Sequence, residues 1–358
     1  MVQPSFYFYS FMKLRVLYAV LDWGLGHATR SETLIRSLNS RGLAVSIASS
    51  GLALKYLKLQ FPNLSFLELP DREVKYSKSG ATLGILRRAV VQRELNNKQQ
   101  KWTQFQLEKA HFDFVISDNV YGVYSPDIPS VLITHQLKPL SPVFQKNVSK
   151  KIASWVNRFD EVWIPDFGED GIAGEMLNNP IVNIPRKYLG NMSRFENFEV
   201  KKEIDFLGII SGPEPQAELF YNLIQEKLRN GPNKIAYNGK KSEYKGKAEH
   251  VELDNNQNLN TLAAQSHFII CRSGFTSLLD ILKIRGNALI IPTPGQPEQE
   301  YLAHRMKKMN LMHNMSQKQF KRSSLGEFNA FHMDSSWSVS KLNQVLDKFL
   351  ESSLLSAE

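Results

Sequence analysis

The chain is poor in cysteine, with one residue, Cys271, in a length of 358. A single cysteine makes no disulfide within the chain, which excludes a disulfide-stabilised secreted scaffold and favours a reducing compartment. It also excludes zinc modules that need four cysteines. Long hydrophobic runs are missing too, because no apolar segment reaches the roughly 20 residues that span a bilayer. We therefore expect a cytoplasmic protein.

The first residues lack the features of a signal peptide. Residues 1–11 are rich in aromatic side chains but have no basic region and no small-residue cleavage site. The stretch from Met12 to Arg15 resembles a natural start. We expect residues 1–11 to be an extension outside the core fold.

Acidic residues are outnumbered by basic ones, 35 against 44, which gives a net charge of +9. This excess favours an anionic partner, whether nucleic acid, anionic lipid or a phosphorylated small molecule, and does not choose among them. The hydrophobic share of 42% and the charged share of 22% are typical of folded globular protein. The length indicates two domains.

Short apolar runs alternate with helical stretches, as in a parallel sheet with helices on both faces. The strands predicted in the first half are Arg15–Leu21, Ala44–Ser50, Leu64–Leu69, Phe112–Ser117, Ser130–Thr134 and Glu161–Pro165. Those predicted in the second half are Asp205–Ile210, Lys234–Tyr237, His250–Leu253, Phe268–Cys271 and Ala288–Ile291. The stretch Asn178–Lys202, rich in Asn, Pro, Gly and charge, is expected to link the halves.

This pattern predicts an α/β protein of two Rossmann-like domains that face a central cleft. We place the first domain at residues 12–190, the second at 203–335, and a closing C-terminal helix within 336–358. In such folds a ligand binds outside the carboxyl ends of the strands.

Two predicted strands each run into a loop of small residues that opens a helix. The loops are DWGLGHATRS, residues 22–31, and CRSGFTSLLD, residues 271–280. Glycine lets the backbone approach a ligand, and a helix start presents unpaired N–H groups to an anion. In the second loop, Asp280 is placed to accept hydrogen bonds from a ribose diol. Both loops are also consistent with structure alone, with His27 solvated and Ser273 capping its helix.

A third loop, IPTPGQPEQEYLA at residues 291–303, follows a buried strand. Its prolines and glycine indicate a rigid turn. Acidic residues at the next helix start, such as Glu298, complement the helix dipole. Gln299 gains little from that dipole, which favours a hydrogen-bonding role for it.

A fourth group of polar residues follows two strands of the first half. Asp118 and Asn119 follow one predicted strand, and His135 follows the next. Because both strands are predicted to be parallel to the first one, these side chains are expected at the same rim as His27. They line a second ligand's site or serve as turn and core residues.

Taken together, the motifs resemble those of nucleotide-sugar glycosyltransferases of the two-Rossmann (GT-B) class. The resemblance spans about Lys13 to Lys308 and is closest to enzymes similar to the peptidoglycan N-acetylglucosaminyltransferase and to bacterial UDP-glucuronosyltransferase-like proteins. Its most specific part is R-S-G-x(5)-D followed by P-T-P-G-Q-x-E-Q-E. The segment from Ile210 to Pro215 also resembles the phosphate loop that opens the donor domain of that class.

The resemblance implies that the second half holds the nucleotide sugar. It places Ser273 and Gly274 at the diphosphate, Asp280 at the ribose, Gln299 at the sugar or ribose, and the base near Asn255–Leu259. The residues implied on the donor side are Ser211, Gly212, Arg272, Ser273, Gly274, Asp280, Gln296, Gln299 and Glu300.

In the first half, the resemblance makes His27 the general base of an inverting transfer, with Asp118 as a second catalytic residue. Gly24, Gly26, Asn119 and His135 would lie on the acceptor side. The resemblance implies no metal and no cofactor, the nucleotide sugar being a co-substrate, and no D-x-D motif of the metal-dependent enzymes is present.

Three positions depart from the family pattern. Asp22-Trp23 replaces a double glycine, and Asp22 either supports His27 or reflects a different acceptor. Glu300 stands where relatives often have a second Gln, and a carboxylate there would repel a diphosphate. Asp280 is one methylene shorter than the Glu of some relatives.

The segment Thr82–Arg93 combines aliphatic and basic residues, as an interfacial helix does. It indicates either an ordinary surface helix or peripheral contact with the cytoplasmic membrane face, as in cell-envelope synthesis.

The functions that the sequence supports are a UDP-sugar glycosyltransferase acting on a glycan or lipid-linked acceptor, a nucleotide-sugar hydrolase on the same fold, and a non-catalytic nucleic-acid-binding protein. The hydrolase alternative rests on the G-x-G-H-x-x-R pattern at Gly24–Arg30, with Asp118 or His135 positioning a water. Since no nucleic-acid motif is recognised, a nucleic-acid partner is not expected.

Overall fold

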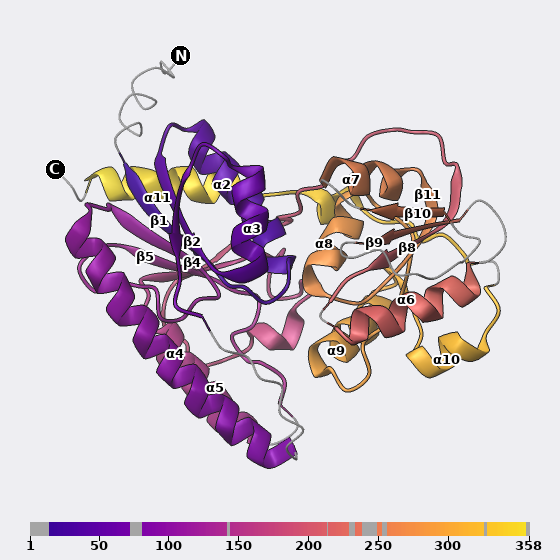
Figure 1. Ribbon diagram of the computed structural model, residues 1–358, viewed down its shortest axis with the longest axis horizontal. Coiled ribbons are helices and arrows are strands. Elements are labelled where there is room, and N and C mark those ends of the chain that lie inside the picture. The colour runs from indigo at the N-terminus through magenta and orange to yellow at the C-terminus, as the bar shows by residue number, and fades with distance from the viewer. Residues whose placement is uncertain are drawn as a thin grey trace. The chain divides into compact units, whose positions relative to one another are not determined.

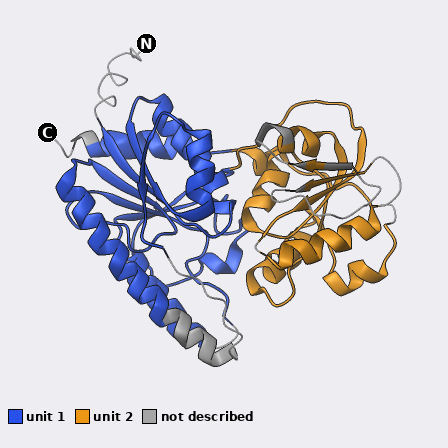
Figure 2. Cartoon of the chain, in the orientation of Figure 1, with its two compact units in different colours: residues 1–192, 340–358 blue, residues 193–339 orange. Residues whose placement is uncertain are grey.

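A computed structural model describes residues 14–71, 81–141, 144–212, 214–228, 233–237, 249–252, 256–325 and 328–355. The expected extension at residues 1–11 lies outside these ranges, as do Pro213 and residues 253–255. The chain divides into two compact units (Figures 1 and 2). Unit 1 comprises residues 1–192 and 340–358, and unit 2 comprises residues 193–339.

Unit 1 contains a parallel sheet of seven strands in the order β3-β2-β1-β4-β5-β6-β7. The strands are β1 Arg15–Val20, β2 Ala44–Ser49, β3 Ser65–Glu68, β4 Phe114–Asp118, β5 Ser130–Ile133, β6 Glu161–Ile164 and β7 Arg186–Tyr188. Its helices are α2 Gly26–Ser40, α3 Gly51–Gln60, α4 Ala81–Lys109, α5 Gln145–Val156, the short η1 Gly174–Leu177 and α11 Leu342–Leu355. The apolar runs of β1 and β4 are buried because helices cover a parallel sheet on both faces.

Unit 2 contains a parallel sheet of six strands in the order β10-β9-β8-β11-β12-β13. The strands are β8 Ile204–Ile210, β9 Lys234–Tyr237, β10 Glu249–Glu252, β11 Ser266–Cys271, β12 Ala288–Ile290 and β13 His313–Asn314. Its helices are α6 Gln216–Lys227, α7 Asn256–Ala264, α8 Phe275–Lys283, α9 Pro297–Lys308, α10 Gln317–Arg322 and η2 Ser335–Ser338. The predicted α/β architecture is therefore confirmed in both halves.

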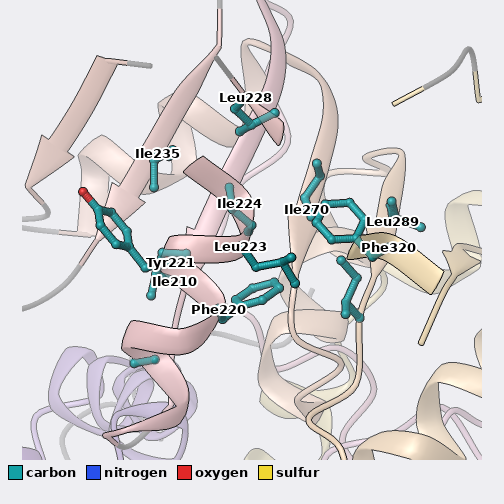
Figure 3. Packing of buried hydrophobic residues seen from close by; sticks show 12 residues of the cluster. Ile210, Phe220, Tyr221, Leu223, Ile224, Leu228, Ile235, Ile270, Leu289 and Phe320 are labelled. Carbon is teal, nitrogen blue, oxygen red and sulfur yellow. The ribbon is translucent and has the colours of Figure 1, made fainter. Parts of the chain in front are cut away.

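In the core of unit 2, apolar residues at helical spacing pack against apolar residues of the strands. Phe220 and Ile224 lie four residues apart on α6, and both point toward the sheet residues Ile270 and Leu289 (Figure 3). Phe320 of α10 closes the same cluster. Burying one such side chain contributes about 1.5–3 kcal/mol.

The C-terminal helix α11 belongs to unit 1, although it follows unit 2 in the sequence (Figure 2). The ring of Phe349 lies edge-on to Phe114 of β4 at 5.2 Å and to Trp163 of β6 at 5.3 Å. Ser340 forms a bridge with Gly190. The last segment of the chain therefore completes the packing of the first unit.

Each predicted strand has a counterpart within two residues, but two further edge strands were not expected. The stretch 178–202 is not a plain linker, because it contains β7, which pairs with β6. Strand β13 pairs with β12 over two residues. Edge strands this short carry little hydrophobic pattern, which explains why the sequence did not reveal them.

The segment Thr82–Arg93 forms part of α4. The side chains of residues 81–89 lie outside the described part of the structure, so membrane contact by this segment stays a prediction. Among the described residues, none of the helices has the length and apolar character needed to cross a membrane.

Candidate functional sites in the two units

The candidate site of unit 1 lies at the carboxyl edge of its sheet. Strand β1 leads into the glycine loop and α2, Asp118 is the last residue of β4, and His135 follows β5 by two residues. Because β1, β4 and β5 are neighbours in the sheet, these three positions come together, as the parallel arrangement predicts.

The glycine loop delivers His27 to the first turn of α2. Gly24 has a φ of +69°, which a residue with a side chain rarely adopts. Leu25 is the N-cap and gives no side-chain cap, and α2 begins at Gly26. The imidazole of His27 remains 15% exposed. Trp23 in the same loop is 63% exposed.

A fully buried carboxylate, that of Asp118, lies at the centre of the site. Its Oδ2 accepts hydrogen bonds from Arg30 Nε at 2.9 Å and from Ser31 Oγ at 2.8 Å. Its Oδ1 lies 2.8 Å from His27 Nδ1 and also accepts from Arg30 Nη2. All three partners come from α2, so this helix and β4 build the site together.

The charge state of Asp118 is decided by two opposed effects. Burial alone would raise the pKa of Asp118, but the charges and hydrogen bonds of Arg30 and His27 outweigh it and hold the pKa well below its ordinary value. The carboxylate is therefore ionised at neutral pH. A buried charge of this kind is tolerated only when it is paired and hydrogen-bonded.

The contact with an ionised carboxylate determines which nitrogen of His27 carries the proton. Nδ1 of His27 lies 2.8 Å from the carboxylate of Asp118, which only accepts, and 2.9 Å from Nη2 of Arg30, which only donates. We assign the proton to Nδ1, so that Nδ1–H donates to Asp118 in a charge-assisted bond while Nη2 of Arg30 donates to the same carboxylate. Nε2 then has a free lone pair and is able to take up a proton. The geometry is that of a histidine base oriented by an acid.

Arg30 is a site residue that the sequence reading did not single out. Its side chain is 1% exposed, and Nη1 lies 3.0 Å from His135 Nδ1. Arg30 follows His27 by three residues, a spacing that puts both on one face of a helix. That spacing, inside the G-x-G-H-x-x-R pattern, was the signal that could have revealed it.

Asn119 is held in the left-handed region, with a φ of 60°. Its side-chain oxygen accepts from Thr134 Oγ1 at 3.1 Å, and its N–H donates to the carbonyl of Ile133 at 3.0 Å. These bonds join the ends of β4 and β5. Asn119 therefore ties the end of β4, where Asp118 lies, to the segment after β5 that carries His135.

Asp22 has a different role from the support of His27 that the sequence allowed. Its Oδ1 accepts from the N–H of Ala53, in the first turn of α3. Burial, partly offset by this bond and reinforced by the nearby charge of Asp71, raises the pKa of Asp22. The acid that supports His27 is Asp118.

In unit 2, the second predicted loop precedes α8. Gly274 is the N-cap of α8 and, as a glycine, provides no side-chain cap. Ser273 is fully buried, and its hydroxyl donates to the carbonyl of Gln299 at 2.8 Å. Ser273 therefore braces α9 and is not the helix cap that the alternative reading expected.

Arg272 is enclosed within unit 2 and is 3% exposed. Its guanidinium carbon lies 4.0 Å from the ring centre of Phe220, and Nη1 donates to the carbonyls of Ile291 and Pro292 at 3.3 Å each. Burial lowers the pKa of Arg272 to about 10. These contacts are all with protein groups, and a contact of Arg272 with the donor stays a prediction. Its neighbour Cys271 is also buried, which raises the thiol pKa to about 12.

The third loop is held by the polar side chains that the sequence assigned to the donor. Gln296 is the N-cap of α9 and accepts from the N–H of Gln299. Gln299 Oε1 accepts from the N–H of Thr293 at 2.9 Å, and Glu300 Oε1 from that of Gly295 at 2.9 Å. The amide oxygens of both glutamines thus shape the loop itself.

Asp280 accepts a hydrogen bond from the hydroxyl of Ser193, the first residue of unit 2. Ser193 Oγ also accepts from the N–H of Phe195 at 2.9 Å. The carboxylate of Asp280 is therefore fixed by the segment that enters the unit.

The phosphate loop expected after β8 is described only in part. Ser211 and Gly212 are exposed, and Gly212 has a φ of +101°, so a glycine is needed there. For the base region, residues 253–255 lie outside the described ranges and Leu259 is buried.

A pocket of about 470 Å³ opens in unit 2 between α9 and α10. It is lined by Pro292, Glu300, Ala303, Lys307, Asn314, Met315, Ser316, Gln319 and Ser323. Glu300 is the one member of the predicted donor set in this lining. Across the part of the chain that the structure describes, no group of three or more His, Cys, Asp or Glu side chains could hold a metal ion.

Comparison with solved structures defines the fold class: the chain has the GT-B fold of two Rossmann-like units. The calicheamicin glycosyltransferase CalG4 aligns over 95% of both chains with a TM-score of 0.63 and 12% identity. The spinosyn rhamnosyltransferase SpnG complexed with thymidine diphosphate aligns over 95% of this chain and 96% of its own, with a TM-score of 0.61 and 12% identity. MurG of Acinetobacter baumannii aligns over 96% and 92%, with a TM-score of 0.52 and 14% identity.

At identities of 12–14%, these similarities show the fold alone, so the activity has to be argued from the residues of the site. No protein-family model matches the chain, and no curated protein matches it either. The fold that the sequence motifs predicted is confirmed.

Proposed function

We propose that this protein is an inverting, metal-independent glycosyltransferase that moves a sugar from a UDP-sugar to a hydroxyl of a glycan or lipid-linked acceptor. The observation that carries the proposal is the contact of His27 Nδ1 with the buried, ionised Asp118 at the mouth of the glycine loop. A histidine held in this way is a general base, and sugar transfer needs one.

In the proposed reaction, Nε2 of His27 takes the proton of the acceptor hydroxyl as its oxygen attacks the anomeric carbon. The new carbon–oxygen bond forms while the bond from that carbon to the diphosphate breaks, and UDP leaves with the electron pair. Attack from the opposite face inverts the anomeric centre. Asp118 stabilises the imidazolium that forms, as the acid of a catalytic triad does.

On the donor side, we propose that the diphosphate binds at the start of α8 through backbone N–H groups of Gly274 and its neighbours. A helix N-terminus stabilises the negative charge that builds up on the leaving group. Asp280 would accept hydrogen bonds from the ribose. Gln299 would orient the sugar. Ser211 and Gly212 would support the phosphates.

The ligands of two structural neighbours support a nucleotide-sugar donor. SpnG was solved with thymidine diphosphate, and the Arabidopsis thaliana enzyme UGT89C1 was solved with UDP-L-rhamnose, at a TM-score of 0.59 and 12% identity. The preference for uridine in this chain rests on the motif resemblance. A cytoplasmic location with peripheral membrane contact is part of the proposal and rests on the net charge of +9 and the basic segment of α4.

A hydrolase on the same fold is the second candidate, because the G-x-G-H-x-x-R pattern continues into the site. Arg30 of that pattern joins Asp118 and His135 in one network, as a water-positioning site would need. Sugar release from the nucleotide sugar without any acceptor would distinguish hydrolysis from transfer.

The first test is thermal unfolding of the full chain with UDP, GDP, CDP, dTDP and a short DNA. A ligand at 100 times its Kd adds about 2.7 kcal/mol to the free energy of unfolding, which gives a shift of several degrees. A shift with one diphosphate supports the donor site and names the base. A shift with DNA alone would contradict the proposal.

The second test is the variant His27→Ala, assayed for turnover and for UDP binding. We expect turnover to be lost while the Kd for UDP stays unchanged, because the base does not bind the donor. Normal turnover in this variant would remove the general-base assignment. Activity in EDTA equal to that in added Mg²⁺ is the expected result for a metal-independent reaction.

A further inference from the structure

Helices α9 and α10 of unit 2 (Figure 1) enclose the pocket of about 470 Å³, which the proposed reaction does not use. Each helix lines it with residues at the spacing i, i+3 and i+7, which lie on one side of a helix. These are Glu300, Ala303 and Lys307 on the first helix, and Ser316, Gln319 and Ser323 on the second. Pro292, Asn314 and Met315, from the carboxyl ends of β12 and β13, complete the lining. Small molecules bind in α/β proteins at this edge of a sheet.

Two charged side chains of opposite sign line this pocket at different levels of α9. Glu300 and Lys307 are seven residues apart, so their positions differ by about 10.5 Å along the helix axis. Within the described ranges, the ammonium group of Lys307 has no ion-pair or hydrogen-bond partner. The pocket therefore has an acidic end and a basic end that do not neutralise each other.

The carboxylate of Glu300 is already oriented by the protein. Its Oε1 accepts a hydrogen bond from the N–H of Gly295 at 2.9 Å. Since a carboxylate accepts through both oxygens, Oε2 is able to accept from a ligand. On the facing helix, Oε1 of Gln319 accepts from the N–H and the hydroxyl of Ser316 at 2.9 and 2.8 Å. The amide nitrogen of Gln319 is thereby left as a donor on the pocket wall.

We propose that this pocket binds a zwitterionic α-amino acid with an apolar side chain. The ammonium group of the ligand donates to Oε2 of Glu300, and its carboxylate accepts from Nζ of Lys307 and the amide of Gln319. An amino acid about 3.5 Å long with a hydrogen bond of about 2.8 Å at each end spans about 9 Å, close to the separation of about 10.5 Å along α9. The side chain of the ligand contacts Ala303 and Met315.

The two charges of the pocket disfavour other small ligands. A simple anion would be attracted by Lys307 but repelled by Glu300, and a simple cation would meet the reverse. Only a ligand that carries both charges matches both ends. The inference is independent of sugar transfer, because Glu300 is the one residue that the pocket shares with the predicted donor set.

The ligand class is tested by isothermal titration of the full chain with L-leucine and two analogues. N-acetyl-L-leucine lacks the ammonium group, and L-leucinamide lacks the carboxylate. We expect leucine to bind with a Kd of about 1 mM or below. Each analogue should bind about tenfold more weakly, because it loses one charge-assisted hydrogen bond. Absence of leucine binding, or equal binding of leucine and either analogue, would overturn the proposal.

The location of the ligand is tested with two variants of α9 and a matched control. Lys307→Met should weaken leucine binding about tenfold and have no further effect on leucinamide, which lacks the carboxylate. Glu300→Gln should do the same for leucine and spare N-acetyl-leucine, while its amide oxygen still accepts from Gly295. The control Lys308→Met removes an exposed lysine of the same helix that does not line the pocket, and should bind leucine like the wild type. Equal losses in Lys307→Met and Lys308→Met would overturn the assignment of the pocket.

Competition with UDP distinguishes this pocket from the proposed donor site. We expect the Kd for leucine to be the same with and without saturating UDP. Displacement of leucine by UDP would assign the pocket to the donor site and overturn the inference. A chain that binds leucine but no nucleoside diphosphate would overturn the proposed function and leave the amino-acid site in place.

Discussion

The two candidate sites of this protein use their polar side chains in different ways. In unit 1, the side chains of His27, Arg30 and Asp118 bind one another and form a charged network. In unit 2, the side chains of Gln296 and Gln299 bind backbone N–H groups of their own loop. In the first site, the contacts fix the orientation of side chains. In the second site, they fix the conformation of the loop backbone.

This difference fits the two tasks of the proposed reaction. A base must have one defined proton and one free lone pair, and only a charged neighbour such as Asp118 specifies both. A diphosphate needs several N–H groups that point at one place, and a rigid loop before a helix provides them. Three variants and one pH series test this difference between the sites, and they follow in order of expected effect.

The largest effect is expected for Asp118→Asn. The substitution leaves the buried guanidinium of Arg30 without its counter-charge, and breaking a buried ion pair in this way costs about 3–5 kcal/mol. Turnover should fall by about 10²–10⁴, because the base loses its orienting acid. Urea unfolding and steady-state kinetics measure the two effects. In the control Ser31→Ala, which removes one hydrogen bond to the same carboxylate, we expect a cost of about 0.5–1.5 kcal/mol.

Acid should reduce the difference in stability between the wild type and Asp118→Asn. The pKa of Asp118 lies lower in the folded protein than its ordinary value of 3.8, so the unfolded chain binds this proton more tightly. The stability that Asp118 contributes is therefore fully present above 3.8 and is lost as the pH falls toward the folded-state value. Urea unfolding at several pH values below about 5 measures this narrowing. A constant difference in unfolding free energy would contradict the ion pair.

In unit 2, Asp280→Ala is expected to weaken UDP binding about tenfold, because one or two hydrogen bonds to the ribose are lost. It should also release Ser193, at a cost of about 1 kcal/mol. Isothermal titration with UDP measures the first effect. Asp205→Ala, which removes an exposed acid of the same unit, is the matched control. An unchanged Kd would reject the ribose assignment.

The smallest effect is expected for Gln296→Ala, which removes the N-cap of α9. Loss of a cap costs about 0.5–2 kcal/mol, and the loop should lose part of its order. The Kd for UDP should rise less than in Asp280→Ala, because the affected contacts lie within the protein. Gln216→Ala at the start of α6 serves as the control in thermal unfolding. If Gln296→Ala abolished binding without loss of stability, Gln296 would be a direct donor ligand.

Periodicity and loop composition were enough to predict the two Rossmann-like halves, because buried parallel strands are continuous apolar runs. The same reasoning placed Asp118 and His135 at the rim of His27, since the ends of parallel strands share an edge. It missed Arg30 because a basic residue in a helix normally indicates a solvated surface. It did not show that the side chains of Ser273 and Gln296 bind backbone groups of their own unit, because a polar residue in a loop looks the same in the sequence whether it binds a ligand or the backbone.

The return of the chain to its first unit also has a consequence for synthesis. Unit 2 is an insertion: the chain leaves unit 1 after Met192 and re-enters it at Ser340, beside Gly190. Leu346 and Leu350 of α11 are fully buried, so unit 1 stays incomplete until α11 has been translated. Unit 2 has all of its strands earlier and is able to fold first on the ribosome. The half of the protein that is synthesised first is thus the half that is finished last.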